Sequence, residues 1–302
     1  MIHWGVSAGT HDASLSVVKD GEILFASHSE RFSGIKNDKN LNPMLVDYAK
    51  TFFGEPDIVH WYENPYLKFL RQLIAGQPKP FKRNNIKRYL RDLNISCKWT
   101  YVGHHESHAA AFYKSGFEDA TIVVLDSIGE FDCTSIWHAK DGKMKKLQSV
   151  KYPHSIGLFY SAMTDRVGLK PQQDEGKFEE LSQEHLPFSM LEHQMERDLI
   201  KEFTPLPKFK KNLHRGLRGM YSEFSNKEIA AAARKNFETL IRAVLWRARE
   251  LSDSRNIVIG GGVAFNKFIP TRTARWDNLY IPPNPSDTGS AEGAVLAYLN
   301  NT

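Results

Sequence analysis

The 302-residue sequence contains little cysteine and no long apolar run. Two cysteines, Cys97 and Cys133, are too few for a disulfide framework and favour a reducing cytoplasm. No stretch approaches the ~20 apolar residues that a membrane-spanning helix needs. The opening residues Met1 to Gly5 lack the basic and apolar segments of a signal peptide. We therefore expect a cytoplasmic protein with no membrane partner.

The glycine spacing of dinucleotide-binding proteins is also absent. Gly260, Gly261 and Gly262 follow a predicted short strand at residues 256–259, but they do not form a GxGxxG pattern. Consecutive glycines let a backbone pass close to a ligand, and they also make tight turns. The sequence therefore gives no support for an NAD site.

Positive charge is in slight excess and is unevenly distributed. The net charge is +5, and the segment from Lys79 to Arg91 has six basic residues and no acidic one. A second basic stretch runs from Lys208 to Arg218. Such runs suit either a solvated surface or contact with nucleic-acid phosphates. The candidate nucleic-acid residues are Lys79, Lys82, Arg83, Lys87 and Arg88.

A unit of strands, a polar loop and a hairpin turn occurs twice. Strands are expected at 2–7, 13–18 and 22–27, and again at 121–125 and 133–138. The turns are Asp20-Gly21 and Asp141-Gly142, because glycine tolerates positive φ. This internal duplication predicts two lobes that grip one ligand between their loops.

Helices are expected elsewhere. Ser225 and Glu228 form a capping box that opens an amphipathic helix. Small residues predict another helix from Ser290 to about Asn300, and residues 68–94 read as a basic helical insertion.

Three histidines within five residues give the sharpest chemical signal. His104 and His108 are i and i+4 on a predicted helix, so their imidazoles can bind one metal ion. Asp287 is the candidate third ligand. Glu106 does not complete the zinc-protease motif His-Glu-x-x-His, because Ala109 stands where the second histidine would follow His105. In the first loop, His11 beside Asp12 is a candidate for orienting or deprotonating a hydroxyl.

Together these motifs resemble the carbamoyltransferase family that includes the nodulation-factor and antibiotic O-carbamoyltransferases. The N-terminal part of that family is similar to the catalytic subunit of tRNA threonylcarbamoyl transferase. The matching motifs, in chain order, are His11-Asp12-Ala13-Ser14, Glu30-Arg31-Phe32, Lys36, His104-His105-x-x-His108, Asp126-x-x-Gly129-Glu130, Ser155-Ile156-Gly157, Glu175-Gly176-Lys177, Gly260-Gly261-Gly262-Val263-Ala264-x-Asn266 and Asp287-Thr288-Gly289-Ser290.

The resemblance implies an α/β, actin-like (ASKHA) duplicated two-lobed fold. Lobe I would span residues 1–118, with the basic insertion and the histidine-rich metal helix, and lobe II residues 119–302, with the nucleotide-binding loops. It also implies Fe²⁺ at His104, His108 and Asp287, and Mg²⁺ with the nucleotide. The donor would be ATP-derived carbamoyl adenylate, made from carbamoyl phosphate. By analogy His11 and Lys36 lie beside the reacting group. The implied nucleotide residues are Asp126, Ser127, Gly129, Glu130, Lys177, Gly260, Gly261, Gly262 and Asn266.

Two departures from the family pattern are visible. Similar proteins continue into a YrdC-like domain that makes carbamoyl adenylate, whereas this chain stops soon after Asp287. We expect either a separate YrdC-like protein or direct use of carbamoyl phosphate. The segment after Lys177 also lacks the Met-Gly turn of the family.

The acceptor is the least determined feature. Short relatives are similar to phage-type enzymes that modify 5-hydroxymethylcytosine in DNA, which would place the protein in a host cytoplasm. The alternatives are a sugar or another small-molecule hydroxyl, a non-catalytic nucleotide-binding regulatory subunit, and a kinase or ATPase of the same fold. The histidine pair argues against the last, because Mg²⁺ in such sites is held by oxygen ligands.

Overall fold

The first predicted hairpin unit forms at the N-terminus of the computed structural model, which describes residues 1–74, 85–270 and 276–301. Strands β1 (Ile2–Ser7), β2 (Ser14–Lys19) and β3 (Glu22–His28) form an antiparallel meander. Asp20 and Gly21 both have positive φ, at 53° and 84°. That is the type I′ geometry that two-residue hairpins favour.

The second unit repeats this arrangement with β6 (Asp119–Leu125), β7 (Asp132–Lys140) and β8 (Lys143–Lys151). Each meander is extended by two parallel strands, which are β4 (Ile58–Trp61) and β5 (Lys98–Tyr101) in the first sheet and β11 (Asn256–Gly260) and β12 (Asn278–Tyr280) in the second. The strand orders β3-β2-β1-β4-β5 and β8-β7-β6-β11-β12 are therefore equivalent. The predicted duplication is confirmed.

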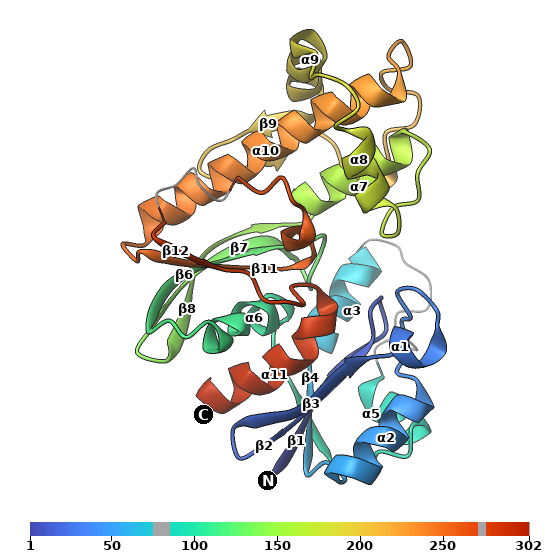
Figure 1. Cartoon of the computed structure of the whole chain (residues 1–302), viewed down its shortest axis with the longest axis vertical. Coiled ribbons are helices and arrows are strands. Elements are labelled where there is room, and N and C mark those ends of the chain that lie inside the picture. The colour runs from blue at the N-terminus through green and yellow to red at the C-terminus, as the bar shows by residue number, and fades with distance from the viewer. Residues whose placement is uncertain (75–84, 271–275, 302) are drawn as a thin grey trace.

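The two sheets and their helices form a stack of layers (Figure 1). Helix α2 (Pro43–Phe53) covers the outer face of the first sheet, and α7 (Ile156–Arg166) and α10 (Asn226–Leu251) cover the second. Between the sheets lie α6 (His104–Ala109), its extension η1 (Ala110–Lys114), and α11 (Asp287–Asn301).

Shorter elements complete the described part of the chain. They are α1 (Glu30–Ser33), α3 (Pro65–Ile74), α5 (Ile86–Asp92), α8 (Glu175–Leu181), α9 (Ser189–Leu199), β9 (Ile200–Glu202), β10 (Lys208–Phe209), η2 (Leu213–Arg215) and η3 (Gly262–Phe265). The capping box at Ser225 is present, with Ser225 Oγ accepting a hydrogen bond from the Glu228 amide. No helix in the described ranges is both long and apolar enough to cross a membrane.

Helix α11 returns from the second sheet to the first. It packs on β1, β2 and α6, so the predicted division at residues 118 and 119 separates the strands of the two sheets but not this helix. Two glycines permit the approach. A Cβ on Gly5 would lie 1.8 Å from the Ala291 carbonyl oxygen, and one on Gly293 would lie 1.8 Å from that of Ser107. The backbones of α6 and α11 therefore touch directly.

This contact predicts that Gly293→Ala destabilises the protein. The new methyl group meets a backbone oxygen, which cannot rotate away, and overpacking of this kind costs about 1–3 kcal/mol or more. Urea denaturation measures the free energy of unfolding. Gly176→Ala in α8 is the matched control, because no atom lies within 4 Å of its added Cβ. Equal stabilities of the two variants would contradict the packing argument.

Candidate metal centre between two cavities

Helix α6 begins where two loops from different sheets meet. Gly103 is its N-cap, and the Glu130 carboxylate accepts hydrogen bonds from the amides of His104 (2.9 Å) and Asn64 (2.6 Å). An acidic side chain at a helix N-terminus satisfies unpaired amides and opposes the positive end of the helix dipole. Glu130 therefore fixes the position from which the histidines project.

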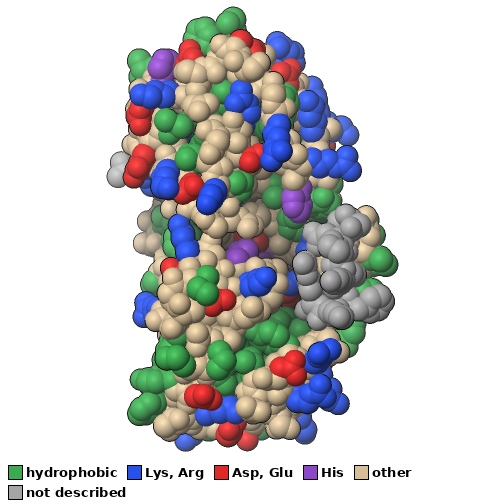
Figure 2. Space-filling model, turned by 90° about the vertical axis from the view of Figure 1, so that its right-hand side faces the viewer, with side chains coloured by type: hydrophobic (Ala, Val, Ile, Leu, Met, Phe, Trp, Pro, Cys, Tyr) green, Lys and Arg blue, Asp and Glu red, His purple; other side chains and the backbone are tan. Residues whose placement is uncertain are grey.

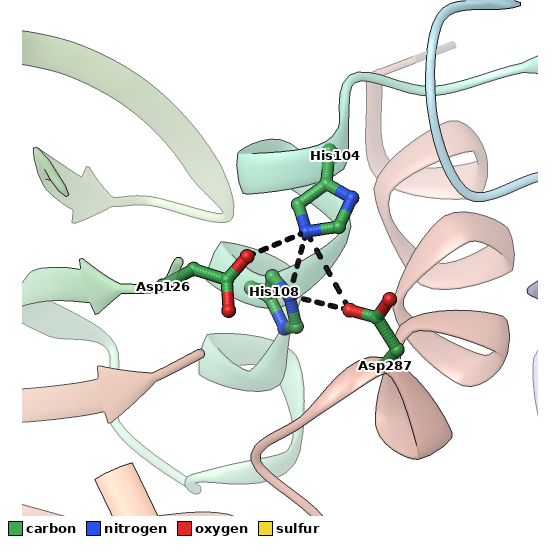
Figure 3. Close-up of side chains that lie close together, drawn as sticks. All are labelled: His104, His108, Asp126 and Asp287. Carbon is green, nitrogen blue, oxygen red and sulfur yellow. Dashed lines mark hydrogen bonds and ion pairs between the residues drawn. The ribbon is translucent and has the colours of Figure 1, made fainter. Parts of the chain in front are cut away.

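Four buried side chains converge beside α6 (Figure 3). His104 and His108 come from α6, Asp126 follows β6, and Asp287 begins α11. His104 Nε2 lies 3.1 Å from Asp126 Oδ2, 3.5 Å from Asp287 Oδ1 and 3.2 Å from His108 Nε2. His108 Nε2 lies 3.3 Å from Asp287 Oδ1. The four ligand atoms lie within 4.8 Å of one another, as a shared cation requires.

The charges of this cluster fit a divalent cation. Two carboxylates with two neutral imidazoles carry a net charge of −2, which is costly to bury without a counter-charge. Burial alone would lower the pKa of His104, but the carboxylates of Asp287 and Asp126 raise it to about 10 in the metal-free protein. The same histidine lowers the pKa of Asp287 to about 2, although burial opposes this. Two imidazoles and two carboxylates suit Fe²⁺ or Zn²⁺.

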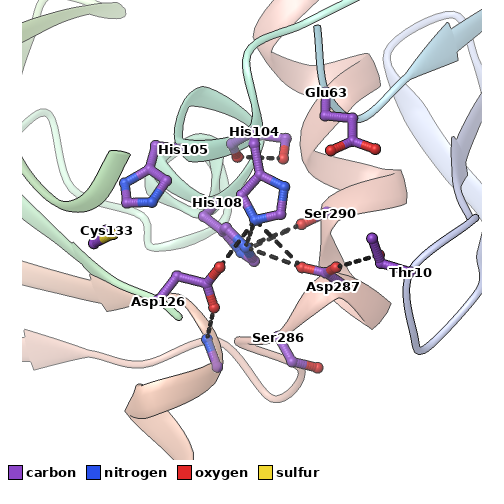
Figure 4. A network of polar contacts seen from close by, with 12 residues as sticks. Thr10, Glu63, His104, His105, His108, Asp126, Cys133, Ser286, Asp287 and Ser290 are labelled. Carbon is purple, nitrogen blue, oxygen red and sulfur yellow. Dashed lines mark hydrogen bonds and ion pairs between the residues drawn. The ribbon is translucent and has the colours of Figure 1, made fainter. Parts of the chain in front are cut away.

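Neighbouring groups orient the cluster (Figure 4). Asp126 Oδ1 accepts a hydrogen bond from the Gly262 amide (3.3 Å), and Asp287 Oδ2 accepts one from Thr10 Oγ1 (3.5 Å). Ser290 Oγ lies 3.3 Å from His108 Nδ1. Partners of this kind fix ring and carboxylate orientation around metal ions. His105 points elsewhere, toward Ser135 Oγ at 2.8 Å.

A cavity of about 310 Å³, called cavity I, lies on the side of the glycine-rich segment. Six of the residues predicted from the sequence line it: His11, Lys36, Asp126, Ser127, Gly262 and Asn266. Lys36 Nζ donates to the Gln173 carbonyl at 2.7 Å, so this side chain reaches from the first sheet's loops to those of the second. Tyr160, Phe237, Val263 and Phe265 supply an apolar wall.

The remaining predicted nucleotide residues do not line cavity I. A Cβ on Gly129 would lie 2.9 Å from the His105 ring, and one on Gly260 would lie 3.1 Å from the His108 carbonyl oxygen. Gly261, at φ +88°, packs on the Leu125 backbone. These glycines and Glu130 contact the helix and the strand that carry the clustered side chains, so they position the cluster without lining the cavity. Lys177 is exposed and pairs with Asp174 at 2.8 Å, while its α8 neighbours Glu175, Gly176 and Glu179 line the cavity.

A larger cavity of about 660 Å³, called cavity II, opens on the other side of the cluster. His104, Asp126 and Asp287 line it together with Thr10 and Tyr62. His11, Asp126, Ser127 and Gln172 border both cavities. Figure 2 shows the molecule hollowed between its two halves, with histidine and acidic side chains visible in the hollow. The cluster therefore stands at the junction of two chambers.

His11 lies at this junction. Its Nδ1 is 3.1 Å from Asp12 Oδ2 and 3.9 Å from Asp287 Oδ2. Burial alone would lower the pKa of His11, but the carboxylates of Asp287 and Asp12 raise it to about 9. A divalent cation at the cluster would oppose these carboxylates. Because Nδ1 faces Asp12, Nε2 is the nitrogen left for a substrate.

The predicted nucleic-acid residues fall in two groups. Lys79, Lys82 and Arg83 lie outside the described residues. Lys87 and Arg88 are exposed on α5, and Arg88 Nε lies 3.6 Å from Asp92 Oδ2. Neither lines a cavity described above, so their contact with nucleic acid remains a prediction.

Known proteins with similar sequences match this chain over most of its length. The family described as Carbamoyltransferase N-terminus matches residues 62–296, which include the whole metal cluster. The chain belongs to this family. An uncharacterized protein of Synechocystis is 29% identical over 98% of this chain and 57% of its own length. The nodulation protein NolNO of Sinorhizobium fredii is 24% identical over 96% of this chain and 46% of its own.

This family member thus spans about half the length of the curated relatives it matches. Solved structures agree on the fold. HypF of T. kodakarensis superposes with a TM-score of 0.58 at 15% identity, covering 99% of this chain and 48% of that one. The (R)-2-hydroxyglutaryl-CoA dehydratase component A of Acidaminococcus fermentans gives 0.53 at 16%, covering both chains completely. The predicted actin-like two-lobed fold is confirmed.

Sequence reasoning assigned Asp126 to the nucleotide and missed its place in the cluster. A signal existed, because Asp126 directly follows the buried strand β6, where a side chain emerges at the sheet edge. Glu175, Gly176 and Val263 of cavity I belong to the family motifs, whereas Glu179 and Phe265 had no comparable signal.

The geometry predicts that Asp126→Asn weakens metal binding. An amide keeps the shape but removes one anionic ligand, and even outer-shell losses at metal sites cost 10–100-fold in affinity. We expect at least about a tenfold weaker affinity for Co²⁺, followed by its visible absorption. Asp119→Asn, at the opposite end of β6, is the control, since Asp119 faces His138 at 3.4 Å. Unchanged affinity of Asp126→Asn would exclude this carboxylate from the site.

Proposed function

We propose that this protein transfers a carbamoyl group from carbamoyl adenylate to a hydroxyl at the His104–His108–Asp126–Asp287 cluster. The observation that carries the proposal is the position of this cluster between two cavities that share His11, Asp126 and Ser127. A group-transfer site needs a chamber for the donor, a chamber for the acceptor and an electrophile-activating group where they meet. Membership of the carbamoyltransferase family supplies the chemistry.

Cavity I suits the nucleotide of the donor. Gly157 lies in the first turn of α7, an 11-residue helix whose N-terminus faces Ser127, and a helix N-terminus attracts phosphate oxygens. Phe265 and Val263 offer an apolar surface to an adenine ring. Carbamoyl phosphate and ATP are the proposed source of the adenylate, formed either on this chain or by a separate YrdC-like protein.

The proposed step exchanges one bond at the carbamoyl carbon. The acceptor oxygen bonds to that carbon, the bond from the carbon to the phosphate oxygen breaks, and AMP leaves with the electron pair. The carboxylates that raise the pKa of His11 would be offset by a bound cation, and neutral His11 then takes the hydroxyl proton at Nε2 while Asp12 holds Nδ1. A bound divalent cation, for which we propose Fe²⁺, would polarise the carbonyl and stabilise charge on the leaving phosphate. Lys36 lies in cavity I where it can pair with that phosphate.

5-Hydroxymethylcytosine in DNA is the proposed acceptor. The size of cavity II, about 660 Å³, supports a nucleotide there, and the basic residues exposed on α5 support contact with the DNA backbone outside the cavity. The second candidate is a sugar or other small-molecule hydroxyl, favoured by the similarity to a nodulation protein. A purely regulatory role is disfavoured, because the folded chain keeps both histidines and both carboxylates of the cluster together.

The acceptor assignment predicts a mass change in DNA. Purified protein is incubated with preformed carbamoyl adenylate, Fe²⁺ and duplex DNA that carries 5-hydroxymethylcytosine, and the digested nucleosides are weighed. We expect a nucleoside heavier by one carbamoyl group. Parallel DNA with unmodified cytosine is the control. If no nucleoside changes while a sugar hydroxyl is carbamoylated, the small-molecule alternative is correct.

The proton-transfer assignment predicts that His11→Gln lowers kcat by about 10²–10⁴, the usual contribution of a positioned base. Metal content should be unchanged, because His11 is not among the four clustered ligands. His28→Gln, at the end of β3, is the control and should keep full activity. Normal turnover of His11→Gln with an intact metal site would refute the role.

A further inference from the structure

Helix α3 has its polar and apolar faces reversed relative to an ordinary surface helix. Leu70 is 45% exposed and Ile74 is 71% exposed, whereas Lys68 and Arg71 are 3% and 8% exposed. A surface helix normally turns its apolar stripe inward. Burying the cationic face instead costs free energy, so folding alone does not explain this orientation.

The two buried cations of α3 differ in their partners. Lys68 forms an ion pair with the buried carboxylate of Glu63. Arg71 lines cavity II, yet its Nε has no hydrogen-bond partner, and no carboxylate among the described residues pairs with it. Buried arginines are rarely unpaired, because desolvating a guanidinium without a counter-charge is costly. The cavity therefore presents a buried cation that lacks an anion.

Further basic residues line cavity II and the cavity beside it. Lys39 and His214 also line cavity II, and His214 borders a neighbouring cavity of about 450 Å³, called cavity III. Burial and the nearby charge of Arg71 lower the pKa of His214. Arg215 and Arg218 line cavity III, which shares Leu158 and Gln172 with cavity II in addition to His214. Cationic side chains therefore line both adjoining cavities, although Arg218 lies 4.0 Å from the carboxylate of Asp165 in cavity III.

We propose that Arg71 is an anion-binding, specificity-determining residue that holds a phosphate group of the carbamoyl acceptor in cavity II. This inference rests on the proposed carbamoyl transfer and adds that the hydroxyl is carried by a phosphorylated molecule. The planar guanidinium donates two parallel hydrogen bonds to phosphate oxygens. Arg71 acts on the acceptor and has no part in the bond exchange itself.

The opposite charges within cavity II set the direction of binding. The carboxylates of Asp126 and Asp287 line the cavity together with the cations of Arg71 and Lys39, and the third carboxylate, Glu63, is already paired with Lys68. A phosphate is attracted to the arginine and repelled by the carboxylates. The acceptor is therefore held with its phosphate on Arg71 and its neutral hydroxyl free to reach the cluster.

The test compares binding of 5-hydroxymethyl-dCMP with that of its uncharged nucleoside, measured by calorimetry on the full chain without donor. Wild-type protein should bind the monophosphate at least about tenfold more tightly, and Arg71→Met should remove that preference while binding the nucleoside as before. Arg71→Lys keeps the positive charge but loses the two parallel hydrogen-bond donors of the guanidinium. This variant should keep part of the preference for the monophosphate. Arg255→Met, at an exposed arginine that pairs with Asp277 and lines none of the three cavities, should behave as wild type.

Several outcomes would overturn the assignment. It is wrong if wild type does not distinguish the two ligands, or if Arg71→Met retains the preference with an unchanged melting temperature. Because no donor is present, these readings stand whether or not carbamoyl transfer occurs, and AMP release from carbamoyl adenylate tests that transfer separately.

A second arm separates a nucleotide acceptor from a polynucleotide. A short single-stranded DNA that carries one 5-hydroxymethylcytosine should bind more tightly than the monophosphate if its further phosphates lie in cavity III. Arg215→Met should then weaken the strand and leave the monophosphate unaffected. Equal affinities would limit the phosphate contact to Arg71. If Arg255→Met weakened binding of both ligands more than Arg71→Met does, the proposed site would be wrong.

Discussion

The direct contact between helices α6 and α11 is the constraint on which the site depends. His104 and His108 project from one helix and Asp287 begins the other, although 179 residues separate His108 from Asp287 in the sequence. Their ligand atoms meet only because Gly293 lets the two backbones touch. Gly5 holds α11 to the first sheet in the same way. A larger side chain at either glycine would force α11 away from the backbone that it contacts.

Most of the strands and helices could be predicted from short-range features of the sequence. The Asp-Gly turns predicted both hairpins, because type I′ geometry needs positive φ at two positions. The capping box at Ser225 and the apolar residues that repeat along one helix face predicted α10. Comparison of the two hairpins then revealed the duplication. Sequence could not show that α11 crosses to the first sheet, since a small-residue helix suits close packing against several partners.

The site was predictable where chemistry is encoded in spacing, and less so where it depends on tertiary approach. The i, i+4 histidines are a property of one helix, so they were found directly. Gly129, Gly260 and Glu130 were recognised as motif residues, but a motif does not distinguish a residue that touches a ligand from one that supports the helix behind it. Lys177 is also a motif residue, but its side chain is exposed to solvent and pairs with Asp174.

The carboxylates of the cluster and the cation of Arg71 together determine the electrostatic character of the site. Two carboxylates, buried where the cavities meet, hold a net negative charge that a metal cation can cancel. Once it is cancelled, the carbonyl of the proposed donor no longer faces the charge of Asp126 and Asp287, and Arg71 is left in cavity II without a carboxylate partner among the described residues. A cluster loaded with a divalent cation is therefore close to neutral overall, with the cation of Arg71 on the side of cavity II. Such a field favours a transition state in which negative charge develops on the carbonyl and phosphate oxygens, and it favours an acceptor that brings an anion of its own.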